Sequence, residues 1–381
     1  MARLPHLLWL GHIGGHTGLG RVSDNLLSRL ADRWRITVIS VSQPCDDFTV
    51  PWATIVPARR FHDWLGRLAL KEVVAADPPD ATVIYADPWV FADFVPFLPE
   101  RLKVWGYLPV DGYNMKHAPA LHRLETAIFL SPFAVREAQR GGYDGPTAVV
   151  PHGVDLALYR RGPQQEARRA LGLPLEGFLL GAVGQNQPRK RWDTLLLAFR
   201  DFLALADGPL WLYCHCNPVD IGWDLPQLAQ YLGIAEMVLF PQGMDRRALL
   251  PEAALAQVYQ AMDLQCTASW GEGFGLTTLE GMACGIPQIV PEHTAYSDWA
   301  TGAGYLLKEC APVVTVGGNN LLGFAPSVQS LVNAWAALLT SPSQRSSCTQ
   351  AGLALARSPR FRWETCADQL HAILLGDAGC P

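Results

Sequence analysis

Ser269-Trp270-Gly271-Glu272-Gly273-Phe274-Gly275 is a glycine-rich stretch between a short apolar run that begins at Leu264 and an amphipathic run that includes Met282. This order predicts a strand, a tight loop and a helix. Gly273 and Gly275 allow the backbone to approach a ligand closely, and the first N–H groups of the helix add donors and a positive dipole end. The layout therefore favours a diphosphate as the ligand.

Two glutamates bracket this loop. Glu272 stands at its mouth and Glu280 stands inside the following helix. The loop carboxylate is placed to accept hydrogen bonds from sugar hydroxyls, whereas the helical carboxylate is placed to accept two from the vicinal hydroxyls of a ribose. Both are expected to act as ionised acceptors.

Short apolar runs alternate with amphipathic runs along the chain, which predicts mostly parallel sheets. Predicted strands and helices of the first half include Leu7–Leu10, Val22–Leu30, Ile36–Val41, Trp64–Ala75, Thr82–Tyr85 and Phe133–Gln139. Those of the second half include Phe178–Val183, Thr194–Ala206, Leu210–His215 and Val238–Phe240. The pattern predicts an α/β chain of two Rossmann-like domains.

The domain boundaries follow breaks in this alternation. Residues 1–160 are expected to form the first domain and residues 161–358 the second, because a polar, arginine-rich stretch interrupts the pattern near residue 160. Residues 359–381 are expected to end the chain as an amphipathic helix. Ala311–Phe324, rich in glycine and asparagine, predicts a long loop, and a helix is predicted at Val328–Leu339.

The composition excludes several classes of protein. With 49% hydrophobic and 17% charged residues, the 381-residue chain is expected to bury substantial cores. A net charge of −5 argues against a basic nucleic-acid platform, and nine scattered cysteines favour a reducing cytoplasm over a disulfide framework. The apolar runs are much shorter than the roughly 20 residues that span a bilayer, so membrane contact is expected to be peripheral at most.

A second loop, between the strand Phe178–Val183 and the next helix, supplies positive charge. It contains the basic run Arg189-Lys190-Arg191. These cations are expected to face the same diphosphate. A third loop, Gly11–Arg21, follows the first strand, but Ser23 stands where a dinucleotide fingerprint has its third glycine or alanine, which argues against a dehydrogenase.

Cys214-His215-Cys216 contains residue types that bind metals. Alternate residues of a strand face opposite sides of the sheet, so the two cysteines share one face and the histidine lies on the other. Three ligands do not converge, and no metal is expected.

Glu272-Gly-Phe-Gly-Leu-Thr-Thr-Leu-Glu280 resembles the paired-glutamate motif of glycosyltransferase family 4. Gly281–Val290 and Val150–Asp155 are similar to other segments of that family, in the same order. The resemblance implies the GT-B fold, in which two Rossmann-like domains with parallel sheets face a cleft and a C-terminal helix crosses back to the N-terminal domain. It also implies retaining transfer of a sugar from a nucleotide-sugar donor, without a metal or other cofactor.

The resemblance also assigns roles to residues. The first domain is expected to bind the acceptor and the second the donor, and the catalytic positions are Glu272, Lys190 and Asp111. The donor-binding positions are Glu280, Gly273, Phe274, Gly275, Leu276, Thr277, Arg189, Gln185, Gly14, Gly15 and His16. Gln185 stands where the family has an arginine, a departure that removes a positive charge unless Arg189 or Arg191 reaches in.

The acceptor is a hydroxyl group of unidentified origin, on a glycan, a lipid-linked sugar or a small molecule. A hydroxymethylated pyrimidine base in DNA is an alternative, because Gln187–Arg191 resembles phage members of the family and Arg59–Arg67 interleaves basic and aromatic residues. Arg59–Arg67 also suits a lipid surface. A second alternative is an inactive GT-B module that binds sugar nucleotides, since the Gln185 departure is compatible with lost chemistry.

Overall fold

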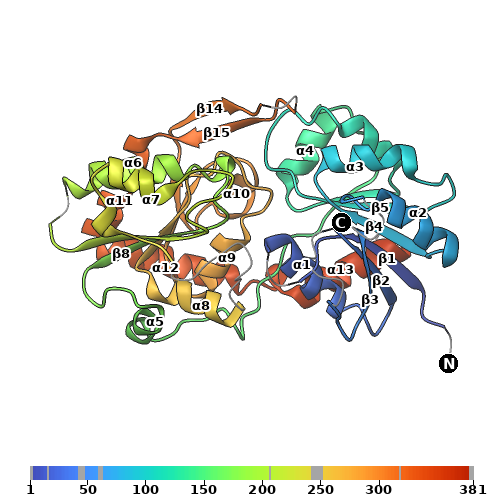
Figure 1. Cartoon of the computed structure of the whole chain (residues 1–381), viewed down its shortest axis with the longest axis horizontal. Coiled ribbons are helices and arrows are strands. Elements are labelled where there is room, and N and C mark those ends of the chain that lie inside the picture. The colour runs from blue at the N-terminus through green and yellow to red at the C-terminus, as the bar shows by residue number, and fades with distance from the viewer. Residues whose placement is uncertain are drawn as a thin grey trace. The chain divides into compact units, whose positions relative to one another are not determined.

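The chain divides into two units. Unit 1 consists of Met1–Gly153 with Pro359–Pro381, and unit 2 of Val154–Ser358. The computed structural model describes residues 3–14, 17–41, 48–58, 63–205, 207–241, 252–316 and 319–376 (Figure 1). The division after Gly153 lies slightly before the boundary expected near residue 160.

Unit 1 is built on a parallel sheet with the order β3-β2-β1-β4-β5-β6-β7 in the described residues. Its strands are β1 (His6–Gly11), β2 (Arg35–Ser40), β3 (Thr54–Pro57), β4 (Ala81–Tyr85), β5 (Val104–Leu108), β6 (Thr126–Phe129) and β7 (Thr147–Val149). Every residue of β1, β4 and β5 is buried, as expected for central parallel strands covered on both faces.

The helices of unit 1 follow its strands. They are α1 (Gly18–Ser28), α2 (Arg67–Ala76), α3 (Pro88–Phe94) and α4 (Pro132–Arg140), with the 3₁₀ turns η2 (Val95–Phe97) and η3 (Ala118–Arg123). Helix α1 starts four residues before the predicted Val22, because the Thr17 hydroxyl caps it by accepting the Gly20 N–H. Helix α2 starts after the predicted Trp64, because Gly66 takes a left-handed conformation with φ of +85°.

The C-terminal segment returns to unit 1. After the turn η6 (Pro359–Phe361), helix α13 (Trp363–Leu375) packs against α1. Arg29 Nε donates to Glu364 Oε1 at 2.8 Å, and Trp34 Nε1 to His371 Nδ1 at 2.9 Å. The terminal helix thus packs on the N-terminal fold, the arrangement that the resemblance implies.

Unit 2 has a second parallel sheet, with the order β10-β9-β8-β11-β12-β13 in the described residues. Its strands are β8 (Phe178–Val183), β9 (Leu210–His215), β10 (Val238–Leu239), β11 (Leu264–Cys266), β12 (Gln288–Pro291) and β13 (Tyr305–Leu307). The two sheets confirm the predicted α/β class with two Rossmann-like domains. Cys214 and Cys216 lie in the core, while His215 Nδ1 lies 3.0 Å from the Tyr213 hydroxyl.

Helices cover both faces of the sheet in unit 2 (Figure 1). One face packs against α6 (Trp192–Leu203), α7 (Leu225–Tyr231) and α11 (Val328–Thr340). The other packs against α5 (Gln164–Leu171) and α8 (Glu252–Ala261). The remaining elements are α9 (Leu276–Ala283), α10 (Ala295–Trp299), α12 (Pro342–Ala356), and the turns η4 (Pro188–Lys190) and η5 (Ala235–Met237).

The prediction of a long loop at Ala311–Phe324 is wrong. Strands β14 (Cys310–Val314) and β15 (Leu322–Pro326) pair there as an antiparallel hairpin. Glycine and asparagine are concentrated in the sequence between the two strands, whereas the flanking residues carry β-branched and aromatic side chains that suit strands. The hairpin is attached to the glycine-rich loop, because the Phe324 N–H donates to the Trp270 carbonyl at 2.9 Å.

The strand order of unit 2 determines where a ligand site forms. The chain runs outward from β8 in one direction through β9 and β10, and in the other through β11, β12 and β13. The loops after β8 and β11 therefore diverge at a topological switch point, where open α/β sheets bind ligands at the carboxyl ends of their strands. These are the two loops that the sequence singles out.

Candidate functional site

The loops after β8 and β11 are joined by their backbones. The Arg189 carbonyl accepts hydrogen bonds from the Trp270 N–H at 3.0 Å and from the Ser269 hydroxyl at 3.2 Å. Ser269 is fully buried, and its hydroxyl also lies 2.8 Å from the Gly271 carbonyl. These contacts fix the basic turn η4 against the glycine-rich loop.

Glu272 holds two cations of the basic turn. Lys190 Nζ pairs with Glu272 Oε1, and Arg189 Nη1 lies 2.8 Å from Oε2. Burial raises the pKa of Glu272, but the neighbouring Arg189 and Lys190 outweigh this effect and lower it to about 2. The carboxylate is therefore ionised at neutral pH, and two cations around one anion leave a positive charge that attracts an anionic ligand.

The structure also shows which arginine reaches inward. Gln185 is exposed, and its carbonyl accepts the Trp192 Nε1–H at 3.0 Å. Arg191 turns to Asp193, with Nη2 at 2.8 Å from Oδ2. Arg189 is the residue that joins Lys190 at Glu272, so the loop keeps an arginine beside the carboxylate despite Gln185.

The glycine-rich loop is fixed from α10. Trp299 Nε1 donates to the Phe274 carbonyl at 2.7 Å, and the two rings stack with centroids 5.2 Å apart. The Glu272 N–H donates to the Thr294 hydroxyl at 3.1 Å. The loop that opens α9 is thus anchored by side chains that follow β12.

Gly275 caps α9 in a left-handed conformation with φ of +93°, and an added Cβ would lie 2.3 Å from the Tyr296 ring. We expect Gly275→Ala to destabilise the protein by about 2 kcal/mol or more, because both backbone strain and a steric clash oppose the methyl group. Thermal unfolding measures this loss. Gly302→Ala, also at positive φ but with open space around its Cβ, separates the strain from the clash. Equal losses in the two variants would contradict the predicted clash.

The remaining predicted donor residues of unit 2 line the start of α9. Gly273 is half-buried, Leu276 begins the helix, and the Thr277 carbonyl accepts the Gln265 Nε2–H at 3.1 Å. Glu280 follows in the second turn and is 2% exposed. The structure therefore places both glutamates of the motif in unit 2, one bound to cations and one inside the helix.

The other predicted site residues belong to unit 1. Gly14 follows β1 with φ of +92°, and its N–H donates to Asp24 Oδ1 at 3.2 Å. Asp111 lies half-buried after β5. Gly15 and His16 lie outside the described residues.

Three residues that support the loop are absent from the predicted site: Thr294, Tyr296 and Trp299. They follow β12, the strand next to β11. Neighbouring parallel strands end on the same side of a sheet. The position of these residues, shortly after the Gly281–Val290 segment, could therefore have indicated that they lie beside the glycine-rich loop.

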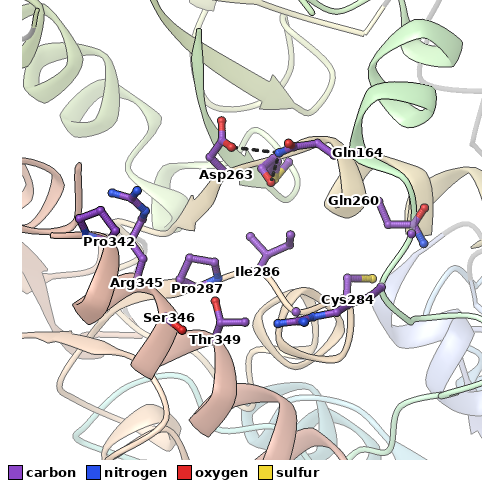
Figure 2. A pocket seen from close by; sticks show the side chains of 14 residues that line it. Gln164, Gln260, Asp263, Cys284, Ile286, Pro287, Pro342, Arg345, Ser346 and Thr349 are labelled. Atoms are coloured by element: carbon purple, nitrogen blue, oxygen red, sulfur yellow. Dashed lines mark hydrogen bonds between the residues drawn. The ribbon is translucent and has the colours of Figure 1, made fainter. Parts of the chain in front are cut away.

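A cavity of about 420 Å³ lies at the amino ends of strands β11 and β12 of unit 2 (Figure 2). Asp263 and Pro287, which directly precede β11 and β12, line it, and Gln164 Nε2 donates to Asp263 Oδ1 at 3.0 Å. None of the described site residues lines this cavity. It is therefore separate from the Glu272 cluster, which lies at the carboxyl ends of the strands.

The basic and aromatic stretch Arg59–Arg67 is described from Asp63 onward, and residues 59–62 lie outside the described residues. Trp64 is 72% exposed, and the Arg67 guanidinium lies 5.1 Å from the centre of the Phe97 ring. In the described part of the chain, no helix combines the length and apolarity required to span a bilayer.

A doubly wound sheet with a glycine-rich loop and a basic turn at its switch point is a nucleotide-binding architecture. The model of the glycosyl transferases group 1 family matches residues 163–354, just over half of the 381 residues, and the chain belongs to this family. A D-inositol 3-phosphate glycosyltransferase of Rhodococcus erythropolis is 32% identical over 229 residues, covering 58% of this chain and 46% of the relative. A relative with the same name from Actinosynnema mirum is 39% identical over 150 residues, covering 37% and 34%. The chain thus matches less than half the length of these relatives.

Solved structures share the fold over the full length. Sucrose-phosphate synthase from Thermosynechococcus elongatus matches with a TM-score of 0.74 and 20% identity, covering 99% of this chain and 100% of that one. Anabaena HepE in complex with UDP and glucose matches with a TM-score of 0.69 and 18% identity, covering 98% and 100%. At these identities the likeness establishes the fold alone.

Proposed function

We propose that the chain is a family 4 glycosyltransferase, which transfers a sugar with retention from a nucleotide-sugar donor to a hydroxyl acceptor. The observation that carries this proposal is the Glu272 carboxylate held by Arg189 and Lys190 in the loop that opens α9. The names of the relatives and the paired-glutamate spacing support it.

The donor is proposed to bind unit 2 through its nucleotide. Its diphosphate lies against the first N–H groups of α9 and the cations Arg189 and Lys190. Its ribose hydroxyls hydrogen-bond to Glu280, and hydroxyls of the transferred sugar to Glu272. The resemblance supports binding of the acceptor by unit 1, with Asp111, Gly14, Gly15 and His16 contributing.

The proposed reaction exchanges one bond at the anomeric carbon. The bond from this carbon to the diphosphate oxygen breaks, and the diphosphate leaves with the electron pair. The acceptor oxygen bonds to the same face of the carbon, and its proton passes to an oxygen of the departing phosphate. Lys190, Arg189 and the α9 N-terminus stabilise the negative charge that develops, without a metal.

The donor base and the acceptor are tested together. The protein is incubated with UDP-, GDP- and ADP-sugars and with acceptors that include inositol phosphates, glycans, lipid-linked sugars and hydroxymethylated DNA, while nucleotide release is followed. UDP-glucose is the first donor to test, because Anabaena HepE has been solved in complex with it.

We expect nucleotide release from one donor class, accelerated by one acceptor class, and a product that keeps the anomeric configuration of the donor. NMR coupling constants of the product identify that configuration. An inverted product would contradict retention. Binding of donors with no release and no donor hydrolysis would instead identify an inactive module.

A further inference from the structure

Glu280 has a partner that the proposed function leaves without a role. The Tyr259 hydroxyl of α8 lies 2.5 Å from Glu280 Oε2 of α9. The Tyr259 hydroxyl is the donor and the Glu280 carboxyl oxygen is the acceptor. Hydrogen bonds of this kind to an ionised acceptor are short and roughly twice as strong as neutral ones.

Tyr259 is itself held firmly. Its side chain is fully buried, and the Tyr159 ring meets it edge-on with centroids 6.0 Å apart. Helix α8 packs beside α9, and the thiol of Cys284, one turn beyond Glu280, approaches the Ala256 carbonyl at 4.0 Å. The Tyr259 hydroxyl, which donates the hydrogen bond, therefore belongs to a packed core and is shielded from solvent.

The bond restricts the Glu280 carboxylate to one orientation. Without a partner, a glutamate carboxylate adopts a broad range of angles about its last carbon–carbon bond, and this freedom is lost when a ligand binds. A carboxylate has about four acceptor positions, so it can accept from Tyr259 and from a ligand hydroxyl at the same time. Two neighbouring hydroxyls of a ribose demand that both oxygens be correctly oriented at once.

We propose that Tyr259 is a positioning residue, which orients Glu280 for the diol of the donor ribose. This inference rests on the proposed function, since it requires a nucleotide at α9. Tyr259 touches no part of the donor in this proposal and acts through Glu280 alone. Removal of the Tyr259 hydroxyl must then weaken the binding only of ligands that have the ribose diol.

The experiment compares Tyr259→Phe with the wild type by titration calorimetry, using UDP, GDP, ADP and their 2′,3′-dideoxy counterparts. We expect Kd for the ribonucleotide that binds to rise by about tenfold, because the ligand must then order a Glu280 side chain that Tyr259 no longer orients. Kd for its dideoxy counterpart should not change. In a Glu280→Ala background, Tyr259→Phe should have no further effect on either ligand.

Tyr143→Phe is the matched control, because the Tyr143 hydroxyl is also buried and donates to the Pro146 carbonyl at 2.8 Å, within unit 1. It should lower Tm without changing any Kd. An equal loss of affinity for ribo- and dideoxy-nucleotides in Tyr259→Phe would assign Tyr259 a purely structural role and overturn the inference. Unchanged ribonucleotide affinity in Tyr259→Phe would overturn it as well, while nucleotide binding by the wild type would leave the proposed function standing.

Discussion

Lys190→Ala is expected to lower kcat for sugar transfer by about a hundredfold or more, with a smaller change in KM for the donor. The ammonium group of Lys190 is paired with Glu272 and is 15% exposed, so it acts from a largely desolvated position. A cation in such a position stabilises the charge that appears on the leaving diphosphate more strongly than one in water. The measurement is the steady-state rate of sugar transfer at saturating acceptor. It uses the donor identified in the comparison of UDP-, GDP- and ADP-sugars.

The control for this variant is Lys308→Ala, which removes an exposed lysine from the same unit. It should leave kcat and KM at their wild-type values. Because Lys190→Ala also removes one partner of buried Glu272, Tm must be recorded, and activity compared well below it. A folded Lys190→Ala protein with wild-type kcat would remove Lys190 from the mechanism.

The periodicity of the sequence was sufficient for most of the predicted elements, because central parallel strands are buried on both faces and form continuous apolar runs. Phe178–Val183 and Leu210–His215 match β8 and β9 residue for residue. The starts of helices were harder to predict. Helix α1 begins at Gly18 because the Thr17 hydroxyl caps it, a local hydrogen bond that hydrophobic periodicity does not reveal.

The hairpin β14–β15 was missed for a different reason. Its strands are partly exposed, so the alternation of apolar residues is weak, and the glycine- and asparagine-rich sequence between them dominates the composition. The hairpin also hydrogen-bonds to Trp270, which is distant in the sequence. Non-local contacts of this kind are not encoded in local propensity.

The site shows the same division between local and non-local information. The motif from Glu272 to Glu280 is continuous in the sequence, and its loop and helix form as predicted. Glu272 pairs with Arg189 and Lys190 of a loop more than 80 residues earlier, and Glu280 accepts from Tyr259 of the preceding helix, 21 residues earlier. The sequence predicts that Lys190 faces a diphosphate. It does not predict that Lys190 forms an ion pair with Glu272 in the ligand-free protein.

Glu272→Gln is expected to have opposite effects on binding and on catalysis. In the ligand-free protein the carboxylate holds Arg189 and Lys190, so an incoming diphosphate must compete with Glu272 for them. Glutamine has nearly the same shape without the charge. Affinity for inorganic pyrophosphate should therefore rise by about tenfold, or about 1.4 kcal/mol, while kcat falls by about a hundredfold because the acceptor for the sugar hydroxyls is weakened.

Glu292→Gln provides the matched control for this charge change. Glu292 is exposed and directly follows β12, so its replacement adds the same net charge near the carboxyl edge of the sheet without touching either cation. A general electrostatic effect would tighten pyrophosphate binding equally in both variants. This gain in affinity would become smaller at high salt. If Glu272→Gln bound pyrophosphate no better than Glu292→Gln, the carboxylate would not be competing for Arg189 and Lys190. Tighter binding in Glu272→Gln alone, lost again when Lys190→Ala is added, is the result that direct competition requires.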